Sequence, residues 1–422
     1  NLSKEKINSD FLNNQNEKLA SDGYRVIAIA NGKVRKKKSY SESDIKKLTF
    51  IGMIGFIDPI RKDVLKSIEE CKIAGIKVLM ITGDHPLTAY SIAKELKLTD
   101  SYDDVTNSEE VDKYLKKGKD KFDTFVNSKK IFTRVTPLQK LEIVESLKRS
   151  GEFVAVTGDG VNDAPALKSA NIGIAMGSGT DIARETAKMI IIDDNFKSIV
   201  SGVKEGRVAY ANIRKIIFFL ISCGLAEVLF FCLSIIFDMP LPLIAVQLLW
   251  LNVVTDGIQD FALSFEKAEK NVMKEKPRDP ESSLFDKNLF ANIAVSGVVI
   301  GIIVFVVWYY LINIINMDVE IARGYIMALM VFIQNIHVFN CRSEESSAFS
   351  IPLKNNKLVV GGVFVSVLLH IIVMENSLLS SFLSTSKIPV NHLIYLFLIA
   401  SLVLIIVEIY KNIKKSFSED KI

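Results

Sequence analysis

Two carboxylates, Asp159 and Asp163, lie four residues apart in a segment whose composition suits phosphate chemistry. The segment reads Thr-Gly-Asp-Gly-Val-Asn-Asp-Ala-Pro and runs from Thr157 to Pro165. Carboxylate oxygens at this spacing suit Mg²⁺, which takes one or two carboxylates beside a phosphate. The glycines let the backbone approach a phosphate closely. An Asp that merely caps a helix would be the preferred interpretation of an isolated Gly-Asp-Gly, but this segment is longer.

An apolar run at 153–156 leads into this segment and predicts a buried parallel strand, because Gly and Asp follow it and a helical pattern comes next. The two carboxylates then lie at the carboxyl end of a strand, where open α/β sheets place their sites. Other strands are expected at 24–30, 50–57, 77–81, 172–176 and 189–192. The helical period between 50–57 and 77–81 predicts a right-handed parallel crossover. Residues 100–130 are charged and irregular, which indicates surface loops with a short helix.

Polar residues also follow other apolar runs in this half of the chain. They form the segments Asp58-Pro59-Ile60-Arg61, Thr82-Gly83-Asp84 and Thr133-Arg134-Val135-Thr136-Pro137-Leu138-Gln139-Lys140. Taken alone, Thr82 would cap the helix that starts near Pro86. Lys140 stands on an expected amphipathic helix, where a lone lysine usually lies on the surface.

Together these segments resemble the signature sequences of the P-type ATPases, a family within the haloacid-dehalogenase-like phosphotransferases. The resemblance covers roughly residues 50–415 and implies phosphorylation of an aspartate by ATP. It implies that the Thr82 hydroxyl donates to a transferring phosphoryl oxygen and that Lys140 neutralises the charge of the aspartyl phosphate. It assigns Mg²⁺ to Asp159, with support from Asp163. The other residues that it assigns to the catalytic and nucleotide-binding site are Asp58, Arg61, Gly83, Asp84, Arg134 and Asn162.

The composition changes along the chain. A length of 422 residues predicts two or more domains. Residues before about 214 alternate apolar and charged runs, while several later stretches approach or exceed about 18 largely apolar residues, enough to span a bilayer. The net charge of +4 gives no argument for nucleic acid binding. The four cysteines lack metal-ligand spacing, which indicates free thiols in a reducing compartment.

We therefore predict an α/β haloacid-dehalogenase-like (Rossmann-like) cytosolic domain followed by an all-α polytopic membrane domain of six helices. The resemblance divides the chain into the end of a nucleotide-binding domain (1–48), a partial phosphorylation domain (49–200), a stalk helix (201–215) and a membrane domain (216–415). The expected spans are 216–237, 243–265, 289–315, 322–339, 358–374 and 392–409. The helix expected from 196 continues into the first span, so we expect it to couple the catalytic domain mechanically to the membrane domain.

Lysine and arginine gather in alternate loops between these spans, while the opposite loops hold little besides Arg323 and Lys387. This asymmetry predicts six spans with both ends of the chain in the cytosol. The basic residues on the cytosolic side are Lys267, Lys270, Lys274, Lys276, Arg278, Lys287, Arg342, Lys354, Lys357, Lys411, Lys414, Lys415 and Lys421. We expect a multi-pass protein of the plasma membrane.

Three carboxylates lie inside the expected spans: Glu227 in the first, and Asp256 and Asp260 in the second. A charged residue at a helix centre costs about 2.5–3.5 kcal/mol on insertion scales, so such residues mark ion pathways. Asn252, Asp256 and Asp260 follow one another at four-residue steps and are expected on one helix face. The alternative is a polar network that only holds helices together.

Residues 247–257 resemble the sixth helix of calcium pumps. The cation ligands predicted on this basis are Glu227, Asn252, Thr255, Asp256, Asp260 and Gln334. Two positions depart from calcium pumps, which carry an Asn where Gly224 stands and a Glu where Gln334 stands. Asp260 and Gln334 are similar instead to the sodium–potassium pump. Oxygen ligands exclude a soft metal. We expect Ca²⁺, with a monovalent cation (Na⁺, K⁺ or H⁺) as the alternative.

The chain is thus interpreted as the carboxyl-terminal part of an ATP-driven cation pump. It contains no Asp-Lys-Thr-Gly-Thr phosphorylation motif and no Thr-Gly-Glu dephosphorylation loop. We therefore expect that it forms no phosphoenzyme alone, and that its partners are the lipid bilayer and the missing amino-terminal part of the same pump. Two alternatives stay open. A phosphatase fused to a membrane anchor leaves Glu227 and Asp256 unexplained, and a non-catalytic membrane half requires that the chain be complete.

Overall fold

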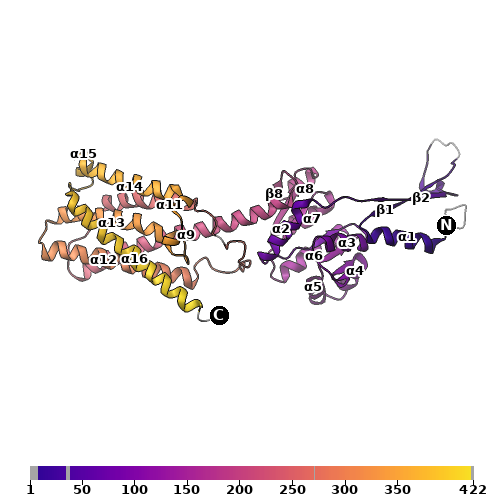
Figure 1. Ribbon diagram of the computed structural model, residues 1–422, viewed down its shortest axis with the longest axis horizontal. Coiled ribbons are helices and arrows are strands. Elements are labelled where there is room, and N and C mark those ends of the chain that lie inside the picture. The colour runs from indigo at the N-terminus through magenta and orange to yellow at the C-terminus, as the bar shows by residue number, and fades with distance from the viewer. Residues whose placement is uncertain (1–7, 35–38, 270, 420–422) are drawn as a thin grey trace. The chain divides into compact units, whose positions relative to one another are not determined.

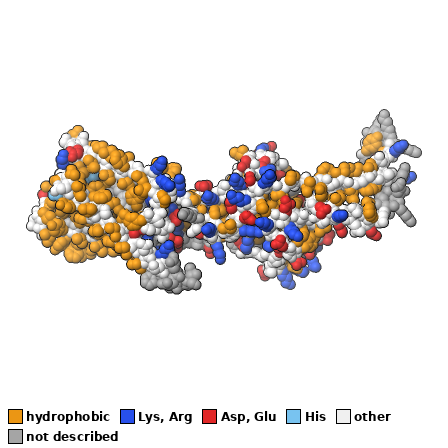
Figure 2. Space-filling model, in the orientation of Figure 1, with side chains coloured by type: hydrophobic (Ala, Val, Ile, Leu, Met, Phe, Trp, Pro, Cys, Tyr) orange, Lys and Arg blue, Asp and Glu red, His pale blue; other side chains and the backbone are white. Residues whose placement is uncertain are grey.

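The computed structural model describes residues 8–34, 39–269 and 271–419. Lys270 and Lys421, two members of the predicted cytosolic charge pattern, lie outside these ranges. The chain forms two compact units. The first, an α/β unit, comprises 1–204 and 273–280; the second, a helical unit, comprises 205–272 and 281–422. In Figure 2, hydrophobic side chains dominate the visible face of the helical unit, while charged side chains are scattered over the α/β unit.

Two short parallel sheets organise the α/β unit. One has the order β3-β5-β4 and the other the order β6-β7-β8. Their strands are β3 (Met80–Thr82), β4 (Val105–Asn107), β5 (Ile131–Thr133), β6 (Ala155–Gly158), β7 (Ile172–Met176) and β8 (Met189–Ile191). The helices of this unit are α1 (Ser9–Ser21), α2 (Lys62–Ile73), α3 (Pro86–Glu95), α4 (Ser108–Leu115), α5 (Lys119–Asn127), α6 (Pro137–Arg149), α7 (Ala164–Ser169) and α8 (Asp181–Thr186). The parallel strands agree with the predicted fold class.

The expected crossover from residues 50–57 is wrong. That run forms β2 (Thr49–Phe56), which pairs antiparallel with β1 (Arg25–Asn31) in a separate two-stranded sheet. An apolar run specifies an extended segment but not its partner, and here the partner is the earlier strand β1. No parallel pairing of β2 is found among the described residues.

The expectation of surface loops at 100–130 is also wrong in part. This region contributes β4, α4 and α5, and its side chains Val111, Phe122 and Val126 are fully buried. They pack with Ile143 and Leu147 of α6 in one apolar cluster. The aromatic and aliphatic residues between the charges form a helical period, so the charged residues mark only the outer faces of the two helices.

Five helices that lie wholly or mostly in the helical unit are long and apolar enough to cross a membrane, among the described residues. They include α9 (Phe196–Ile236), α12 (Lys287–Tyr309), α13 (Val319–Cys341), α14 (Lys357–Glu375) and α16 (Val390–Glu419). The short helix α15 (Ser377–Phe382) follows α14. Helix α9 is continuous over 41 residues, as predicted for the stalk and first span. Helix α13 is buried over most of its length and packs with α16, α14 and α12.

The expected second span is not one regular α-helix. Residues 245–264 form α10 (Ala245–Leu251), the π-helical segment η4 (Asn252–Asp256) and α11 (Gly257–Ser264) in direct succession. A second π-helical segment, η5 (Tyr310–Ile314), ends the span that begins with α12. The run 245–264 has the length of a span, but it is not among the five helices above. The six-helix expectation is therefore supported for five of the spans.

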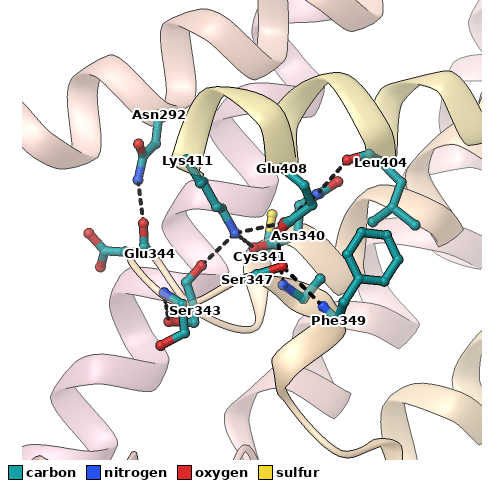
Figure 3. A network of polar contacts seen from close by, with 12 residues as sticks. Asn292, Asn340, Cys341, Ser343, Glu344, Ser347, Phe349, Leu404, Glu408 and Lys411 are labelled. Atoms are coloured by element: carbon teal, nitrogen blue, oxygen red, sulfur yellow. Dashed lines mark hydrogen bonds and ion pairs between the residues drawn. The ribbon is translucent and has the colours of Figure 1, made fainter. Parts of the chain in front are cut away.

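Buried charges hold the end of α13 in the helical unit (Figure 3). Lys411 Nζ, from α16, donates to the carbonyl oxygens of Asn340 at 2.5 Å and Ser343 at 2.9 Å. It also lies 3.2 Å from a Glu408 carboxylate oxygen. Glu408 accepts from Asn340 Nδ2 at 2.8 Å and from the backbone N–H of Ala348 at 2.9 Å. These contacts satisfy backbone groups that would otherwise be left without partners beyond the helix end.

Two further ion pairs fasten the residues that follow α13. Arg342 donates to both oxygens of Glu266, at 2.8 and 3.1 Å, and both side chains are buried. Arg214 of α9 donates to both oxygens of Glu344 at 2.7 Å. Asn292 of α12 donates to the Glu344 carbonyl oxygen at 3.2 Å. The segment after α13 is thus bonded to α9, α12 and α16.

Candidate functional site: a phosphoryl-binding half and a membrane cation site

The hydroxyl of Thr82 lies at the carboxyl end of β3 and donates to Asp84 Oδ2 at 2.9 Å. It also accepts from the backbone N–H of Asp84 at 3.1 Å. The cap of α3 is His85 instead, whose Nδ1 accepts from the N–H of Leu87 at 3.3 Å. The alternative that Thr82 caps this helix is therefore wrong. Gly83 is exposed between the two polar residues, so a phosphoryl oxygen can approach this turn.

Arg134 joins this turn through its backbone. Its N–H donates to the carbonyl oxygen of Thr82 at 2.8 Å, and its φ of 53° lies in the left-handed region. Burial, followed by the positive charge of Arg134, lowers the pKa of His85. The Arg134 side chain is exposed. Arg134 and Thr82 are therefore brought together, as the predicted nucleotide site requires.

The Asp58-Pro59-Ile60-Arg61 segment lies between β2 and α2. Arg61 Nη1 donates to the carbonyl oxygen of Asp194 at 2.6 Å, just after β8. Asp58 is exposed. Hydrogen bonds from Ser178, with a smaller effect of the Arg61 charge, lower the pKa of Asp194. This contact fixes the start of α2 against the end of β8, which suits a hinge better than a phosphate contact.

Lys140 and Asp163 form an ion pair at the end of β6. Lys140 Nζ lies 2.6 Å from Asp163 Oδ1, with side chains 19% and 14% exposed. Asp163 Oδ2 accepts from the N–H of Gly160 at 3.2 Å. A Cβ at Gly158 would lie only 2.5 Å from the Cβ of Asp163, so the pair fits only because residue 158 is glycine. Lys140 therefore faces the predicted site and is not a surface lysine.

Asp159 is the carboxylate left open for a metal ion. Its side chain is exposed, while its carbonyl oxygen accepts from the N–H of Thr180 at 2.8 Å. Both oxygens of Asp163 are already bonded within the chain, so Asp163 orients Lys140 and supports the site. One open carboxylate beside exposed Asn162 fits Mg²⁺, which keeps several waters and uses few protein ligands. When bound, Mg²⁺ would neutralise phosphate charge there.

Strands β3 and β6, which carry Thr82 and Gly158, are each at one edge of their sheet. Leu79 and Ile81, around β3, share an apolar cluster under α6 with Val154, just before β6. The two strands therefore lie under the same helix. Among the described residues neither pairs on its outer side. The prediction of a buried strand at 153–156 needs correction, because β6 is an edge strand with Ala155 and Thr157 exposed.

In the helical unit, Gln334 of α13 joins two predicted cation ligands. Its Nε2 donates to Glu227 Oε1 of α9 at 3.2 Å. Its Oε1 accepts from the hydroxyl of Thr255 in η4. That hydroxyl also lies 2.5 Å from the carbonyl oxygen of Leu251. Three of the predicted ligands from three separate helical segments thus form one connected group.

Asp256 and Asp260 lie beside this group with unpaired oxygens. Asp256 is 7% exposed, and Asp260 is half-buried. The Oδ1 atom of each is buried and has no hydrogen-bond partner among the residues that the structure describes. A buried carboxylate without a partner is costly, so these oxygens suit a cation. Within the described chain no three His, Cys, Asp or Glu side chains are close enough to hold a metal, so amide and hydroxyl oxygens would have to contribute.

Asn252 departs from the expected arrangement. It is exposed, while Thr255 and Asp256 are buried, so Asn252, Asp256 and Asp260 do not share one buried face. The cause is the π-helical geometry of η4, whose wider turns shift the phase of residues four apart. The structure does not bring Asn252 to the group formed by Glu227, Thr255 and Gln334.

Sequence reasoning missed a second polar group next to the first. Gln259 Nε2 donates to Asn335 Oδ1 at 2.8 Å, and Asn335 Nδ2 donates to Ser366 Oγ at 2.9 Å. All three side chains are buried. The available signal was their polarity inside apolar spans, with Gln259 three residues after Asp256 and Asn335 directly after Gln334.

Comparison with known proteins matches both units. Residues 8–171 match the model of the haloacid dehalogenase-like hydrolase family. Residues 240–413 match that of the family described as cation transporting ATPase, C-terminus. This chain belongs to the P-type cation-transporting ATPases. The described residues include five helices that are long and apolar enough to cross a membrane, and with this family membership the chain is an integral multi-pass membrane protein.

Relatives of this P-type ATPase chain occur in bacteria and animals. A calcium-transporting ATPase of Bacillus subtilis is 39% identical over 358 residues, covering 84% of this chain and 40% of the relative. Calcium-transporting ATPase 1 of Bacillus cereus is 35% identical, covering 94% and 46%. Calcium-transporting ATPase type 2C member 1 of Homo sapiens is 33% identical, covering 96% and 43%. The chain therefore spans less than half the length of these relatives.

Proposed function

We propose that this chain forms the carboxyl-terminal part of an ATP-driven Ca²⁺ pump. The observation that carries the proposal is the pair of partnerless carboxylate oxygens of Asp256 and Asp260 beside the Glu227–Gln334–Thr255 group. Carboxylate, amide and hydroxyl oxygens are the ligands that Ca²⁺ prefers. The names of the bacterial and animal relatives support Ca²⁺ as the transported ion.

The α/β unit supplies half of a phosphoryl-transfer site in this proposal. An aspartate from a part of the pump outside this sequence attacks the γ-phosphorus of ATP, and ADP leaves. Thr82 donates a hydrogen bond to the transferred group, while Lys140, held by Asp163, offsets its charge. The free edges of β3 and β6 under α6 support a place for the strand that would carry this aspartate.

Helix α9 couples the two activities. It begins five residues after β8 and carries Glu227 further along its continuous course. A rotation or tilt of this helix would change the distance between Glu227 and Gln334 and so alter cation binding. We place the pump in the plasma membrane with both ends of this chain in the cytosol, with the bilayer and the remaining part of the pump as its partners and without nucleic acid.

The test is ATP hydrolysis by the purified full-length protein with Ca²⁺, Na⁺ or K⁺ as the only variable cation. The expected result is stimulation by Ca²⁺ that is lost when Asp256 is replaced by Asn. Stimulation by a monovalent cation without any response to Ca²⁺ would overturn the choice of ion. That outcome would favour the second candidate, a monovalent-cation pump, which is supported by the neutral amide of Gln334 at a position where a carboxylate would be the fourth of the ligand set.

The polypeptide described here is expected to form no phosphoenzyme by itself, because the aspartate is supplied from outside this sequence. The measurement is incorporation of ³²P from labelled ATP into the isolated chain. Acid-stable, hydroxylamine-sensitive label in this chain would contradict the proposal and show that it contains its own nucleophile.

A further inference from the structure

One short segment holds all the buried carboxylate and amide oxygens that lack a hydrogen-bond partner among the residues that the structure describes. They are Asp256 Oδ1, Gln259 Oε1 and Asp260 Oδ1. An amide oxygen and an ionised carboxylate oxygen can only accept hydrogen bonds, so they cannot satisfy one another. Burying such an oxygen without a partner is unfavourable, most of all for a charged group. The segment therefore needs a positively charged or donating partner that these side chains do not supply.

Gln259 shares a helix face with both carboxylates. Asp256, Gln259 and Asp260 stand at positions i, i+3 and i+4, and the backbone has α-helical dihedral angles from Asp256 into α11. Side chains at these spacings are neighbours on a helix surface. The π-helical segment η4 ends at Asp256, so its shift of phase removes Asn252 from this face but does not affect the turn that follows. Gln259 thus joins the two carboxylates where Asn252 was expected to do so.

Asn335 of α13 fixes which end of the Gln259 amide is available. Asn335 Nδ2 donates to the carbonyl oxygen of Val331 at 2.8 Å and to Ser366 Oγ at 2.9 Å, so both of its N–H groups are used. Its Oδ1 accepts from Gln259 Nε2 at 2.8 Å. If the Gln259 amide were turned over, two acceptor oxygens would face each other. The nitrogen of Gln259 is therefore bound to Asn335, and its oxygen stays available.

Helix α14 encloses the Gln259 amide on another side. Helix α14 packs against both η4 and α11. A Cβ at Gly362 of α14 would lie 3.3 Å from Oε1 and 3.4 Å from Nε2 of Gln259, closer than most contacts of a Cβ atom. The Gln259 side chain is fully buried. The amide is thus bonded to α13 and covered by α14, so its oxygen cannot turn outward to find a partner.

A carbonyl oxygen in this place complements the two carboxylates chemically. Ca²⁺ takes about six to eight oxygen ligands, and side-chain amide carbonyls are among them. Within the described residues no third acidic, histidine or cysteine side chain is close enough to complete a metal site with two others. Gln259 provides an oxygen on the same helical turn as Asp256 and Asp260, and that oxygen has no other bond.

We propose that the side-chain oxygen of Gln259 is a ligand of the transported cation and forms one three-oxygen face with Asp256 and Asp260. Asn335 is the positioning residue of this face, because it holds the Gln259 amide in the orientation that presents the oxygen. The resemblance that named the other ligands gives no role to Gln259 or Asn335. This assignment rests on the proposed function as a cation pump.

The test is equilibrium binding of ⁴⁵Ca²⁺ to the purified full-length pump in detergent, without ATP. Gln259→Leu removes the oxygen at similar size, and Asn335→Leu removes the group that orients it. The matched control is Gln247→Leu. Gln247 is also buried, but its Oε1 accepts from the N–H of Ile244 at 3.1 Å and its Nε2 donates to the Leu383 carbonyl oxygen at 3.1 Å. Thermal unfolding of each variant shows which of them are folded.

Gln259→Leu and Asn335→Leu are each expected to weaken Ca²⁺ binding about 10- to 100-fold, the loss that is typical when residues around a metal site are removed. Gln247→Leu is expected to bind like the wild type. The double variant Gln259→Leu/Asn335→Leu should bind no more weakly than Gln259→Leu alone, because Asn335 acts through Gln259. Losses that add would remove the positioning role of Asn335. Wild-type affinity in folded Gln259→Leu overturns the assignment of Gln259.

The choice of ion is tested separately from the ligand. If the wild-type pump binds ²²Na⁺ or ⁸⁶Rb⁺ instead of ⁴⁵Ca²⁺, Ca²⁺ is the wrong ion, and the same variants compared with that cation still test Gln259. If the wild-type pump binds none of the three, both the proposed function and the assignment of Gln259 fail.

A second measurement covers the case in which the variants do not fold. A cryo-electron microscopy map of the wild-type pump with its cation bound is expected to show the ion in direct contact with Gln259 Oε1, at about 2.3–2.6 Å for Ca²⁺. A cation bound elsewhere in the helical unit, with only water at Gln259 Oε1, overturns the assignment.

Discussion

The side-chain amide of Gln334 lies 3.2 Å from Glu227 Oε1 and so joins α13 to α9 inside the helical unit. The same amide accepts from Thr255, so one residue orients predicted ligands from two other segments. A neutral amide in this position can donate to a carboxylate, which a Glu could do only when protonated. Gln334 therefore positions Glu227 as well as offering its own oxygen.

The first prediction concerns replacement of Gln334 by Leu, which has a similar size. Hydrogen bonds to charged groups contribute about 1.5–3 kcal/mol, so the apparent affinity for the transported cation is expected to fall about 10- to 100-fold. The measurement is the cation dependence of ATP hydrolysis by the full-length pump. The control is Gln247→Leu, because Gln247 is also buried but donates to the carbonyl oxygens of Leu383 and Ser384. Equal affinities in wild type and Gln334→Leu would refute the role of this amide.

The second prediction concerns Lys140→Met. Loss of one preorganised group that stabilises transition-state charge typically lowers a rate by about 10²- to 10³-fold. The rate of phosphoenzyme formation from ATP in the full-length pump is expected to fall within this range. Asp163→Asn should lower it less, because Lys140 keeps its charge but loses its orientation. Lys148→Met, on the same helix, should leave the rate unchanged, since its amino group donates to the Ser169 carbonyl oxygen away from the site.

The third prediction concerns the buried pair Glu408–Lys411. Replacing Lys411 by Met leaves the Glu408 charge uncompensated, which costs about 3–5 kcal/mol of unfolding free energy. The double variant Lys411→Met/Glu408→Gln should lose less than the single variant, because no net charge stays buried. Thermal unfolding in detergent measures both. Losses that simply add in the double variant would argue that the two charges act independently.

The fourth prediction concerns pH. Hydrogen bonds from Arg149 at 2.6 and 3.0 Å lower the pKa of Asp123 in the folded protein. Since the folded pKa lies below the unfolded value of about 3.9, the pair stabilises the α/β unit fully above that pH. This contribution is lost as the pH falls further, through the folded pKa. Amide hydrogen exchange in α5 and α6 should therefore differ between wild type and Asp123→Asn at neutral pH, and the difference should shrink below about pH 4.

A matched control for this experiment is Asp120→Asn, on the exposed face of the same helix α5. Its exchange rates should equal those of the wild type at every pH. A difference between wild type and Asp123→Asn that stays constant down to the most acidic condition would show that the Arg149 contact does not depend on the Asp123 charge.

The parts of this fold that could be predicted are those specified by local pattern. The strand β7 and the continuous helix α9 lie where the apolar runs indicated. The pairing partner of β2 could not be predicted, because its apolar run has the same pattern whether it pairs with β1 or with a parallel neighbour. Register and partner are tertiary properties that a single run of residues does not carry.

The two candidate sites were likewise predictable from local sequence only in part. The resemblance assigned Lys140 and Asp163 to one site, but their ion pair depends on α6 meeting η3 (Val161–Asp163), and the two residues are separated by 23 in sequence number. The three-residue group of Glu227, Thr255 and Gln334 was predicted as ligands, while the exposure of Asn252 was not. Residues four apart share a face only in an α-helix. The sequence of residues 252–256 gave no indication that this segment is a π-helix.

The edges of β3 and β6 have a practical consequence for handling this polypeptide. Edge strands without a partner can pair with other chains, so the α/β unit is expected to self-associate when it is produced on its own. A short synthetic peptide of extended conformation that occupies both edges would act as a donor strand and raise its solubility. The polypeptide can therefore be used to select among such peptides. The peptide that best suppresses its aggregation is expected to have the sequence that fits between the two edges.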